Sequence, residues 1–442
     1  MTALPEHPVG ARPRVGVVGV GYVGLTTAVC LAGRGADTVA VDVDPDKVAQ
    51  LAAGEPGLAE PGMAELLNNV LAKRSLRVTA DYAHLADRDV VFVCVPTPSA
   101  PDGGADLRAL DGAVDELAEV LPRRAVIVLK STVPVGTTRL MAKRLRGRGV
   151  GVVSSPEFLR EGHAVDDFHH PDRVVVGALA EADADLVCTA YGADLAPVMR
   201  MSPESAEMAK YASNAFLAVK LSYANSLAQL CHRTGADIGD VTTCMGADDR
   251  IGPAFLRPGP GWGGSCLPKD TAALLHTARG CDVDLNEVAA ARATNAAQPH
   301  RIATALRRAL GGSVRDARIT AFGLTFKAAT SDIRDSPALA VCAQLAAEGA
   351  QICGYDPELA NIDPEALHAA GVTAVDDPYR AAKSAAAILV LTEWRQFGEL
   401  DWAAIAEQSA GAVVADTRNA LDPATIAQTG LRYLRNGASG GF

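Results

Sequence analysis

The feature that most constrains this chain is a glycine-rich turn close to its start. An apolar run over residues 14–19 leads into the string GVGYVG at residues 19–24, and a second apolar run at residues 38–41 follows a stretch of helical composition. Glycines at the first, third and sixth places permit a tight turn, close approach of a pyrophosphate to a helix N-terminus and close packing of that helix on its strand. The spacing predicts a strand–turn–helix–strand unit that opens a doubly wound parallel sheet.

An acidic residue at the end of the second run completes this pattern. Asp42 follows Gly24 by eighteen residues, where a carboxylate bonds the ribose hydroxyls of a dinucleotide and repels a 2'-phosphate. A glycine-rich turn alone also occurs without any cofactor, but here strand, helix, second strand and acid come in order. We therefore expect a dinucleotide site that prefers NAD to NADP.

Length and charge exclude several classes of protein. A chain of 442 residues exceeds a single ordinary core, and its 49% of apolar residues suffice for two or three domains. A net charge of -11 argues against a nucleic-acid partner. The sequence shows no apolar leader and no stretch long enough to span a membrane, and its nine cysteines include no Cys-x-x-Cys pair. We expect a cytoplasmic protein with no membrane partner, no disulfide scaffold and no metal site.

Apolar runs recur along the chain at the spacing of alternating strands and helices. We expect further strands at residues 89–95, 125–129, 151–155 and 173–177, and again at 319–323, 350–356, 387–392 and 411–416. Between the two groups, residues 202–234 are predicted to form one long helix, and helical segments continue to about residue 310. The sequence thus predicts an α/β fold of two Rossmann-like, doubly wound parallel-sheet domains, joined by a long central helix and a helical middle domain. The expected boundaries are 1–200, 201–310 and 311–442.

A thiol in the middle of the chain is the main candidate for covalent chemistry. The string GPGWGGSCLPKD at residues 259–270 places Cys266 after a bend of small residues and directly before an expected helix. A helix N-terminus and a neighbouring lysine both lower the pKa of a thiol, which makes it a nucleophile at neutral pH. Asp270, four positions on, falls on the same helix face and is a candidate base. The run alone is also compatible with an ordinary loop.

Twelve short strings make the chain resemble one family over essentially its whole length. In order they are GVGYVGL, CVPTP, STVPVGTT, PEFLREG, PDRVVVG, EMAKYASNAFLA, DDRIG, GGSCLPKD, GLTFK, SDIRDSP, TEW and DTRN. The chain resembles the UDP-glucose 6-dehydrogenase family, with the GDP-mannose dehydrogenases as close relatives. The resemblance implies oxidation of a nucleotide-sugar primary alcohol to a carboxylate with two NAD, in which Cys266 holds the half-oxidised sugar as a thiohemiacetal and then a thioester. It assigns NAD binding to residues 1–200, dimerisation to 201–310 and UDP-sugar binding to 311–442.

The resemblance also carries roles to individual positions. The catalytic residues that it implies are Cys266, Lys210, Asn214, Asp270, Thr132 and Glu157. Lys210 and Asn214, one helical turn apart, would stabilise developing negative charge, Asp270 would act as base, and Thr132 and Glu157 would position water. The implied NAD contacts are Gly19, Gly21, Tyr22, Val23, Gly24, Asp42, Lys47, Thr97, Thr132, Glu161, Lys269 and Arg334.

Binding of the nucleotide sugar requires local cations and backbone amides in an acidic chain. The implied substrate contacts are Glu157, Phe158, Leu159, Arg160, Glu161, Lys210, Asn214, Arg250, Phe255, Leu256, Arg257, Gly259, Gly263, Lys327 and Arg418. The resemblance further implies a homodimer in which Arg250 reaches the neighbouring active site.

Alternative functions remain open at this point. GDP-mannose 6-dehydrogenase is the alternative within the family, because the Cys-x-x-Lys-Asp segment suits both substrates. A non-catalytic nucleotide-sugar binder would not need Cys266, Lys210, Asn214 and Asp270 together. A two-electron dehydrogenase of small hydroxy acids would have no use for the C-terminal α/β region.

Overall fold

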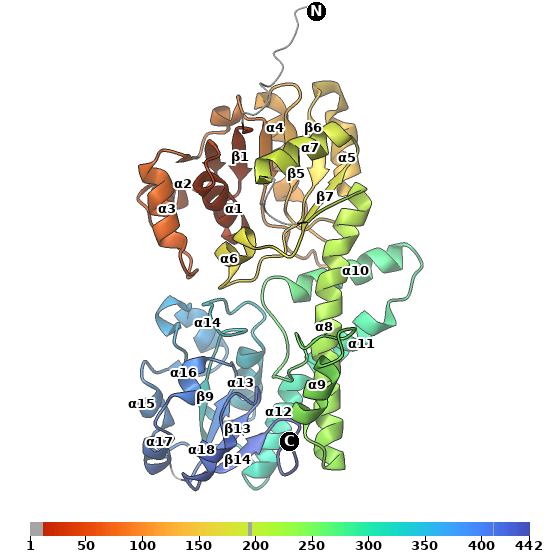
Figure 1. Cartoon of the computed structure of the whole chain (residues 1–442). Helices are drawn as coiled ribbons and strands as arrows, with labels where there is room; N and C mark the ends of the chain where they lie inside the picture. Colours follow the sequence, from red (N-terminus) through yellow and green to blue (C-terminus); the bar gives the residue numbers. More distant parts are fainter. Residues whose placement is uncertain (1–11, 193–196, 410) are drawn as a thin grey trace, which may run out of the picture. The chain divides into compact units, whose positions relative to one another are not determined.

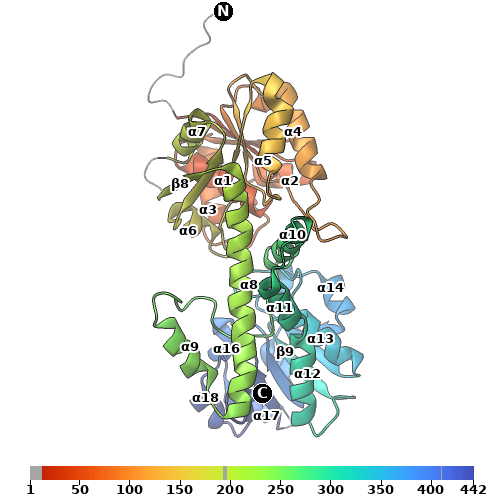
Figure 2. The same cartoon turned by 90° about the vertical axis from the view of Figure 1, so that its right-hand side faces the viewer.

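The computed structural model describes residues 12–192, 197–409 and 411–442. The chain forms two compact units, one of Met1–Ser213 with Ala272–Cys281 and one of Asn214–Thr271 with Asp282–Phe442. The chain changes unit three times, inside α8 (Pro203–Thr234), inside α10 (Leu267–Gly280) and directly after α10 (Figure 1). Figure 2 shows α8 as one uninterrupted helix. No helix in the described ranges combines the length and the apolar character needed to cross a membrane.

The first unit is built on an eight-stranded sheet in the order β3-β2-β1-β4-β5-β6-β7-β8. Neighbouring strands are parallel except for the antiparallel pair β6 and β7. The strands are β1 (Val15–Val18), β2 (Thr38–Val41), β3 (Leu76–Thr79), β4 (Val90–Val93), β5 (Val126–Leu129), β6 (Gly151–Ser154), β7 (Val174–Ala178) and β8 (Val198–Met201). The helical segments are α1 (Tyr22–Gly33), α2 (Pro45–Ala52), α3 (Met63–Ala72), η1 (Tyr82–Leu85), α4 (Arg108–Val120), α5 (Thr137–Leu145), η2 (Arg146–Arg148), α6 (Ala164–His169) and α7 (Glu181–Tyr191).

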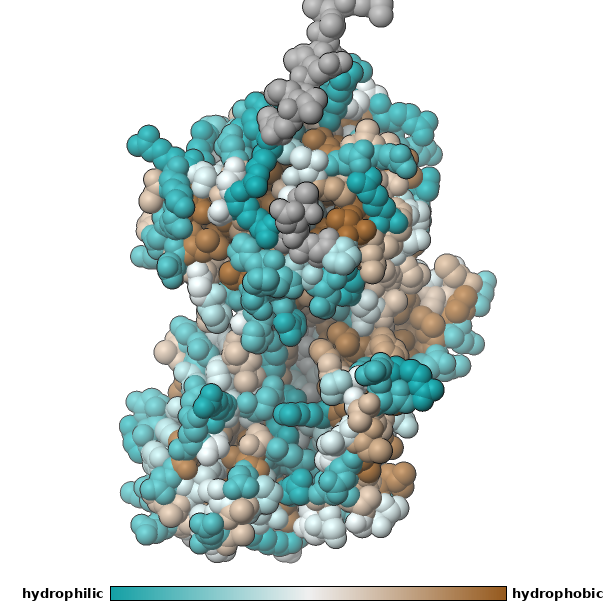
Figure 3. Space-filling model, viewed as in Figure 1, coloured by the Kyte–Doolittle hydropathy of each residue, from teal (hydrophilic) through white to brown (hydrophobic). Residues whose placement is uncertain are grey.

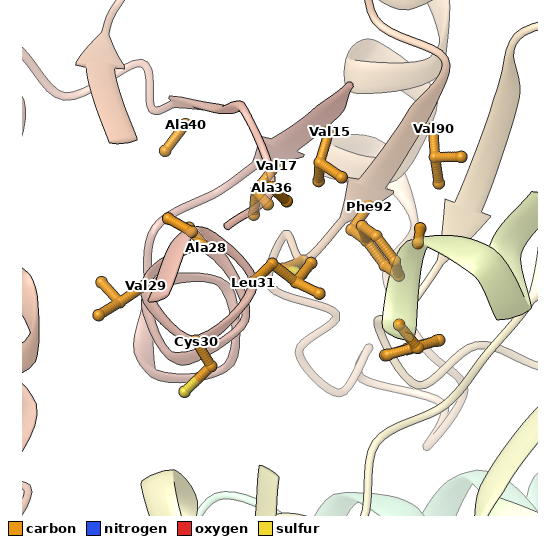
Figure 4. Close-up of a cluster of buried hydrophobic side chains, with 14 of the residues drawn as sticks. Val15, Val17, Ala28, Val29, Cys30, Leu31, Ala36, Ala40, Val90 and Phe92 are labelled. Atoms are coloured by element: carbon orange, nitrogen blue, oxygen red, sulfur yellow. The ribbon is translucent and has the colours of Figure 1, made fainter. Parts of the chain in front are cut away.

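The core of this unit lies on both faces of the sheet. Every residue of β1, β2, β4 and β5 is buried, as expected for parallel strands covered by helices on both sides. Figure 4 shows α1 against the strands, with Leu31 directed toward Phe92. Both side chains are fully buried in one apolar cluster. This packing fixes α1, and therefore the glycine turn that precedes it, at the carboxyl end of β1.

The second unit contains a six-stranded sheet in the order β11-β10-β9-β12-β13-β14, and all its pairs are parallel. Its strands are β9 (Arg318–Phe322), β10 (Gln351–Tyr355), β11 (Val372–Ala374), β12 (Ala387–Val390), β13 (Val413–Asp416) and β14 (Arg432–Arg435). Its other helical segments are α9 (Ile238–Gly246), α11 (Asn286–Ala296), α12 (Gln298–Ala309), α13 (Pro337–Ala347), η3 (Leu359–Asn361), α14 (Pro364–Ala369), α15 (Pro378–Ala382), α16 (Arg395–Gly398), α17 (Trp402–Gln408) and α18 (Pro423–Ala427).

The two sheets share one connection pattern. The first six strands of the first unit and the six strands of the second both follow the order 3-2-1-4-5-6, which is that of a dinucleotide-binding doubly wound sheet. In such a sheet, ligands bind outside the carboxyl ends of the strands where the order reverses, here between β1 and β4 and between β9 and β12. The prediction of two Rossmann-like parallel sheets with a long central helix is confirmed.

Two charged residues of the long helix are buried. Glu207 and Lys210 are only 2% and 3% exposed. Both groups have buried polar partners in the first unit. Those partners belong to the candidate site.

Candidate functional site

The glycine turn between β1 and α1 has the geometry of a pyrophosphate cradle. Gly19 has a φ of +84°, and a Cβ there would lie 2.9 Å from the carbonyl oxygen of Cys94. A Cβ on Gly24 would lie 1.7 Å from the carbonyl oxygen of Gly19, whereas one on Gly21 would meet no atom within 4 Å. The outer glycines thus permit the turn and the close helix packing. The middle one leaves the backbone open to a ligand.

Asp42 lies beside this turn at the carboxyl end of β2. Its Oδ2 accepts a hydrogen bond from the Val20 amide at 2.8 Å, and its Oδ1 accepts one from the Asp44 amide at 3.1 Å. Lys47 Nζ lies 3.4 Å from Oδ2. The carboxylate is therefore held in place where the ribose of a dinucleotide would come, and the residues fit an NAD site.

A buried network links the glycine turn to the loop that carries Glu161. Glu60, which is 8% exposed, contacts the Tyr22 hydroxyl and accepts a hydrogen bond from the Gly162 amide at 2.9 Å. The Gly162 amide also lies 2.8 Å from the Tyr22 hydroxyl. Through Tyr22 and Glu60, the cofactor turn and the loop at residues 160–162 are positioned together.

Two threonines lie at the carboxyl ends of the strands, at the same edge of the sheet as the glycine turn. Thr97 and Thr132 follow β4 and β5, and the Thr97 hydroxyl donates to the Thr132 carbonyl oxygen at 2.9 Å. Both residues are buried. Because β4 neighbours β1, this pair lies at the switch point of the sheet, as expected for loops that contact a dinucleotide.

Lys210 and Glu157 form a buried ion pair in the first unit. Lys210 Nζ lies 3.1 Å from Glu157 Oε1, and the Leu159 amide donates to Oε2 at 2.5 Å. Burial raises the pKa of Glu157, but the Lys210 charge and the Leu159 amide together hold it below its ordinary value. Lys210 Nζ is also 5.2 Å from the centre of the Phe158 ring. The carboxylate is thus kept ionised away from bulk water.

One further acidic side chain fixes the start of α8. Glu207 accepts hydrogen bonds from the Gly136 amide at 2.6 Å and from the Thr138 amide and hydroxyl at 2.7 and 2.6 Å. These donors lie at the N-terminus of α5, where free amides attract a carboxylate. Burial raises the pKa of Glu207 despite these bonds. Since Lys210 lies one turn further along, this contact helps to place its ammonium group.

In the second unit, Cys266 directly precedes α10 and Asp270 lies in its first turn. Asp270 is 1% exposed and accepts hydrogen bonds from Asn214 Nδ2 and Lys269 Nζ, both at 2.6 Å. The Ser265 hydroxyl is 3.5 Å from Cys266 Sγ. The structure therefore brings Asn214, Lys269 and Asp270 together. It places a buried carboxylate one helical turn from the thiol.

Tight glycine contacts hold the thiol loop against the loop between β9 and α13. A Cβ on Gly263 would lie 2.0 Å from the Asp335 carbonyl oxygen, and one on Gly264 would lie 2.8 Å from the Phe326 ring. The Gly264 amide donates to the Arg334 carbonyl oxygen at 2.9 Å. Larger residues at either glycine would displace the loop, so the glycine-rich string serves close packing.

Cations gather where β9, β12 and β13 end. Arg418 is held by the carbonyl oxygens of Leu391 and Phe326, at 3.1 and 3.2 Å, and pairs with Glu393 at 3.1 Å. A Cβ on Gly259 would lie 2.7 Å from Arg418 Nη1. Lys327 Nζ is 5.8 Å from the centre of the Phe326 ring. The structure thus brings together Gly259, Lys327 and Arg418 of the expected substrate contacts, at the switch point of the second sheet.

Other predicted residues lie on exposed loops. The Arg250 side chain is 88% exposed and pairs with Asp248 at 2.6 Å, and Arg257 is exposed. Phe255 is 37% exposed, whereas Leu256 is buried. Two further arginines make local pairs, Arg160 with Asp167 and Arg334 with Asp332. The side chains of Arg160, Arg250, Arg257 and Arg334 thus lie outside the buried polar groups described above. No group of three or more His, Cys, Asp or Glu side chains in the described ranges is arranged to hold a metal.

Family models of three domains match successive parts of the chain. They are the NAD binding domain (residues 13–193), the central domain (204–297) and the UDP binding domain (320–423) of the UDP-glucose/GDP-mannose dehydrogenase family. The UDP-glucose 6-dehydrogenase of Rhizobium meliloti is 40% identical over 435 residues, which are 96% of this chain and 99% of that protein. This chain belongs to the UDP-glucose/GDP-mannose dehydrogenase family.

Solved structures of the UDP-glucose/GDP-mannose dehydrogenase family support this assignment. A UDP-glucose dehydrogenase from the hyperthermophilic archaeon Pyrobaculum islandicum matches with a TM-score of 0.88 at 35% identity, covering 98% of this chain and 100% of that one. A GDP-mannose dehydrogenase from Pseudomonas aeruginosa matches with a TM-score of 0.51 at 29% identity, covering 92% and 97%. The chain is an NAD-dependent oxidoreductase, and the resemblance inferred from its motifs is confirmed.

In this member of the UDP-glucose/GDP-mannose dehydrogenase family, several residues that hold the site were missed from sequence. Asn225 Oδ1 accepts from the Gly259 amide at 2.8 Å, and Asn295 exchanges two hydrogen bonds of 2.8 Å with the Trp262 backbone. Ser222 accepts from the Trp262 indole at 2.9 Å. One weak signal existed: Asn225 lies eleven residues after Asn214, about three helical turns on the same face of α8. Nothing in the sequence linked these side chains to the thiol loop.

Proposed function

We propose that the chain oxidises the 6-hydroxyl of UDP-glucose to a carboxylate, giving UDP-glucuronate with reduction of two NAD. The observation that carries the proposal is Cys266 at the start of α10 with Asp270 buried one turn on and bonded to Asn214 and Lys269. A dehydrogenase that stops at the aldehyde has no use for a thiol there. UDP-glucose is favoured over GDP-mannose because the R. meliloti and P. islandicum relatives carry that name and the GDP-mannose dehydrogenase matches less well.

In this proposal, each of the three predicted domains has its own role. Residues 1–200 hold NAD through the glycine turn, Asp42, Lys47, Thr97, Thr132 and Glu161, with Lys269 and Arg334 as further contacts. NAD, when bound, accepts a hydride in each of the two oxidations. Residues 311–442 hold the nucleotide through Lys327 and Arg418, helped by the backbone of residues 259–263. Residues 201–310 supply Lys210, Asn214 and Cys266.

The chemistry of the chain's own residues follows from their charges. Asp270, directly or through a water that passes the proton on to solvent, takes the O6 proton, and Lys210 and Asn214 stabilise the negative charge on that oxygen. Loss of a hydride from C6 then leaves the aldehyde. Cys266 Sγ adds to the aldehyde carbon, which forms a C–S bond and converts the carbonyl to a hydroxyl. Loss of hydride from that carbon gives a thioester. Water, positioned by Thr132 and Glu157 and deprotonated by Asp270, attacks the thioester carbon, and the C–S bond breaks to release the carboxylate and the thiolate.

The stoichiometry of the reaction tests the proposal. With UDP-glucose as the limiting substrate and excess NAD, we expect two NADH per sugar, read at 340 nm, and UDP-glucuronate as the product by mass spectrometry. GDP-mannose at the same concentration should turn over at least about tenfold more slowly, since base and sugar contacts distinguish substrates by a few kcal/mol. One NADH per sugar with free aldehyde would contradict the thioester route, and faster turnover of GDP-mannose would reassign the substrate.

We also propose a homodimer formed through α8. Three large apolar side chains on this helix, Phe216, Tyr223 and Leu230, are 64%, 54% and 57% exposed. They recur every seven residues, so they lie along one stripe of the helix. Figure 3 shows exposed apolar surface in the region where α8 runs in Figure 1. A second copy would cover this stripe, and Arg250, which is exposed, would contact the neighbouring substrate.

Charges placed on the stripe should separate the subunits. The double variant Phe216→Asp/Tyr223→Asp buries two carboxylates in the proposed interface, so we expect it to sediment as a monomer at micromolar concentration where the parent sediments as a dimer. The matched control Leu140→Asp/Val283→Asp changes two residues that are 60% and 51% exposed on other elements. A parent that is monomeric, or a dimer that survives in the stripe variant, would exclude this interface.

A further inference from the structure

A cavity of about 440 Å³ lies within the second unit, away from the thiol loop. It is lined by the last turns of α8, by α12, by β14 and by the chain near Phe442. In Figure 1 and Figure 2 the C-terminus is drawn next to these helices. Six basic side chains line it: Arg233, Arg301, Arg308, Arg432, His232 and His300.

The cavity concentrates positively charged side chains in a protein of net charge -11. No Asp or Glu side chain is among its lining residues. None of its four arginines forms an ion pair with an acidic side chain in the described ranges, whereas many other arginines of the chain do. Four like charges around one hollow repel each other, so an anion in that hollow would relieve the repulsion.

One of these arginines is fixed in position. Arg301 donates to Gln298 Oε1 at 3.1 Å, to Asn436 Oδ1 at 3.0 Å and to the main-chain oxygen of Phe442 at 3.3 Å. Burial, and then the charge of Arg233, lower the pKa of Arg301 to about 10. The group therefore stays charged at neutral pH, and a preorganised guanidinium loses little side-chain entropy when it binds an anion.

We propose that this cavity binds a small anion carrying two or more phosphate groups. Guanidinium groups bind phosphate oxygens in a bidentate manner, and four of them exceed what one orthophosphate needs. The volume falls in the range of small-molecule sites, and Ala305, Ala309 and Leu434 add an apolar wall for an organic part of the ligand. Arg233, Arg308 and Arg432 are exposed, but all the basic groups line one cavity, which favours a small ligand over a nucleic acid.

Calorimetric titration of the whole chain with inorganic tripolyphosphate, at constant ionic strength, tests the proposal. We expect saturable binding by the parent. The double variant Arg233→Gln/Arg308→Gln should bind about a hundredfold more weakly, about tenfold for each charged hydrogen-bond donor removed. The control Arg380→Gln/Arg395→Gln makes the same change in net charge at side chains that are 72% and 92% exposed, and should bind as the parent does. Equal affinity in the two double variants, or no saturable binding by the parent, would overturn the assignment.

Further probes identify the source of the phosphate groups. Tighter binding of ATP than of tripolyphosphate, lost in Arg233→Gln/Arg308→Gln, would assign a nucleotide, whereas equal binding would assign the polyphosphate chain itself. Tighter binding of a single-stranded oligonucleotide than of either would overturn a small-molecule site. The measurement is of binding alone, so its outcome is independent of whether the chain oxidises UDP-glucose.

Discussion

Replacing Cys266 by serine is expected to abolish formation of the acid from UDP-glucose, with a loss of net turnover on the order of a thousandfold or more. A serine hydroxyl at the start of α10 lacks the nucleophilicity of a thiolate at neutral pH, so the aldehyde would not be captured and the second oxidation would not follow. The measurement is the yield of UDP-glucuronate together with the NADH formed per sugar, which should fall from two to one at most.

A second cysteine of the same unit provides the control. Cys244, on α9, is exposed, and Cys244→Ser should leave yield and stoichiometry unchanged. Thermal unfolding of both variants should match that of the parent, which separates a chemical defect from a folding defect. Two NADH per sugar at the parental rate from Cys266→Ser would remove this thiol from the reaction.

Replacing Lys210 by methionine is expected to lower both activity and stability. The change removes the cation proposed to stabilise O6 and leaves the Glu157 carboxylate buried without its partner. Removing one member of a buried ion pair costs about 3–5 kcal/mol of the free energy of unfolding, and we expect kcat to fall about a hundredfold or more. Urea unfolding and steady-state kinetics measure the two effects separately.

The loss of stability in Lys210→Met should depend on pH in a definite direction. In the parent, the pKa of Glu157 is held below its ordinary value of 4.5, so its contribution is present above that pH and is lost as the pH falls through the folded pKa. In Lys210→Met, we expect burial, the largest contribution in the parent, to raise the pKa of Glu157. The variant should therefore become less stable, relative to the parent, as the pH rises above about 4.5.

A double variant distinguishes the effect of Lys210 on folding stability from its effect on catalysis. Lys210→Met/Glu157→Gln removes both charges and should recover most of the lost stability, because no uncompensated charge stays buried. Its activity should remain low, because the proposed electrostatic stabiliser and the water-positioning carboxylate are both gone. Recovery of activity along with stability would show that Lys210 has a structural role only.

The sequence predicted the central strands well and the edge strands not at all. β1, β2, β4 and β5 are continuous buried apolar runs, which are easily recognised. The four strands that were missed, β3, β8, β11 and β14, are the outermost strands of the two sheets. Each carries exposed or half-exposed polar residues, since an edge strand is covered less completely than a central one.

In the candidate site, too, some features could be predicted from the sequence and others could not. The placement of Cys266 before α10 and of Asp270 in its first turn is local, and it follows from the sequence. The Glu60 contact with Tyr22 and the Asn225 contact with Gly259 join residues 38 and 34 positions apart. Only the folded chain reveals them, because a buried Glu or Asn has no local pattern in the sequence.

The changes of unit along the chain have a consequence for how the molecule comes apart. Two of the three changes lie within helices, α8 and α10, and the third lies directly after α10. On α8, Glu207 is bonded into one unit and Asn225 into the other. A hydrogen-bonded helix does not tolerate a break at its middle without fraying on both sides. Loss of order at the middle of α8 would thus loosen the Glu207 contact in one unit and the Asn225 contact in the other.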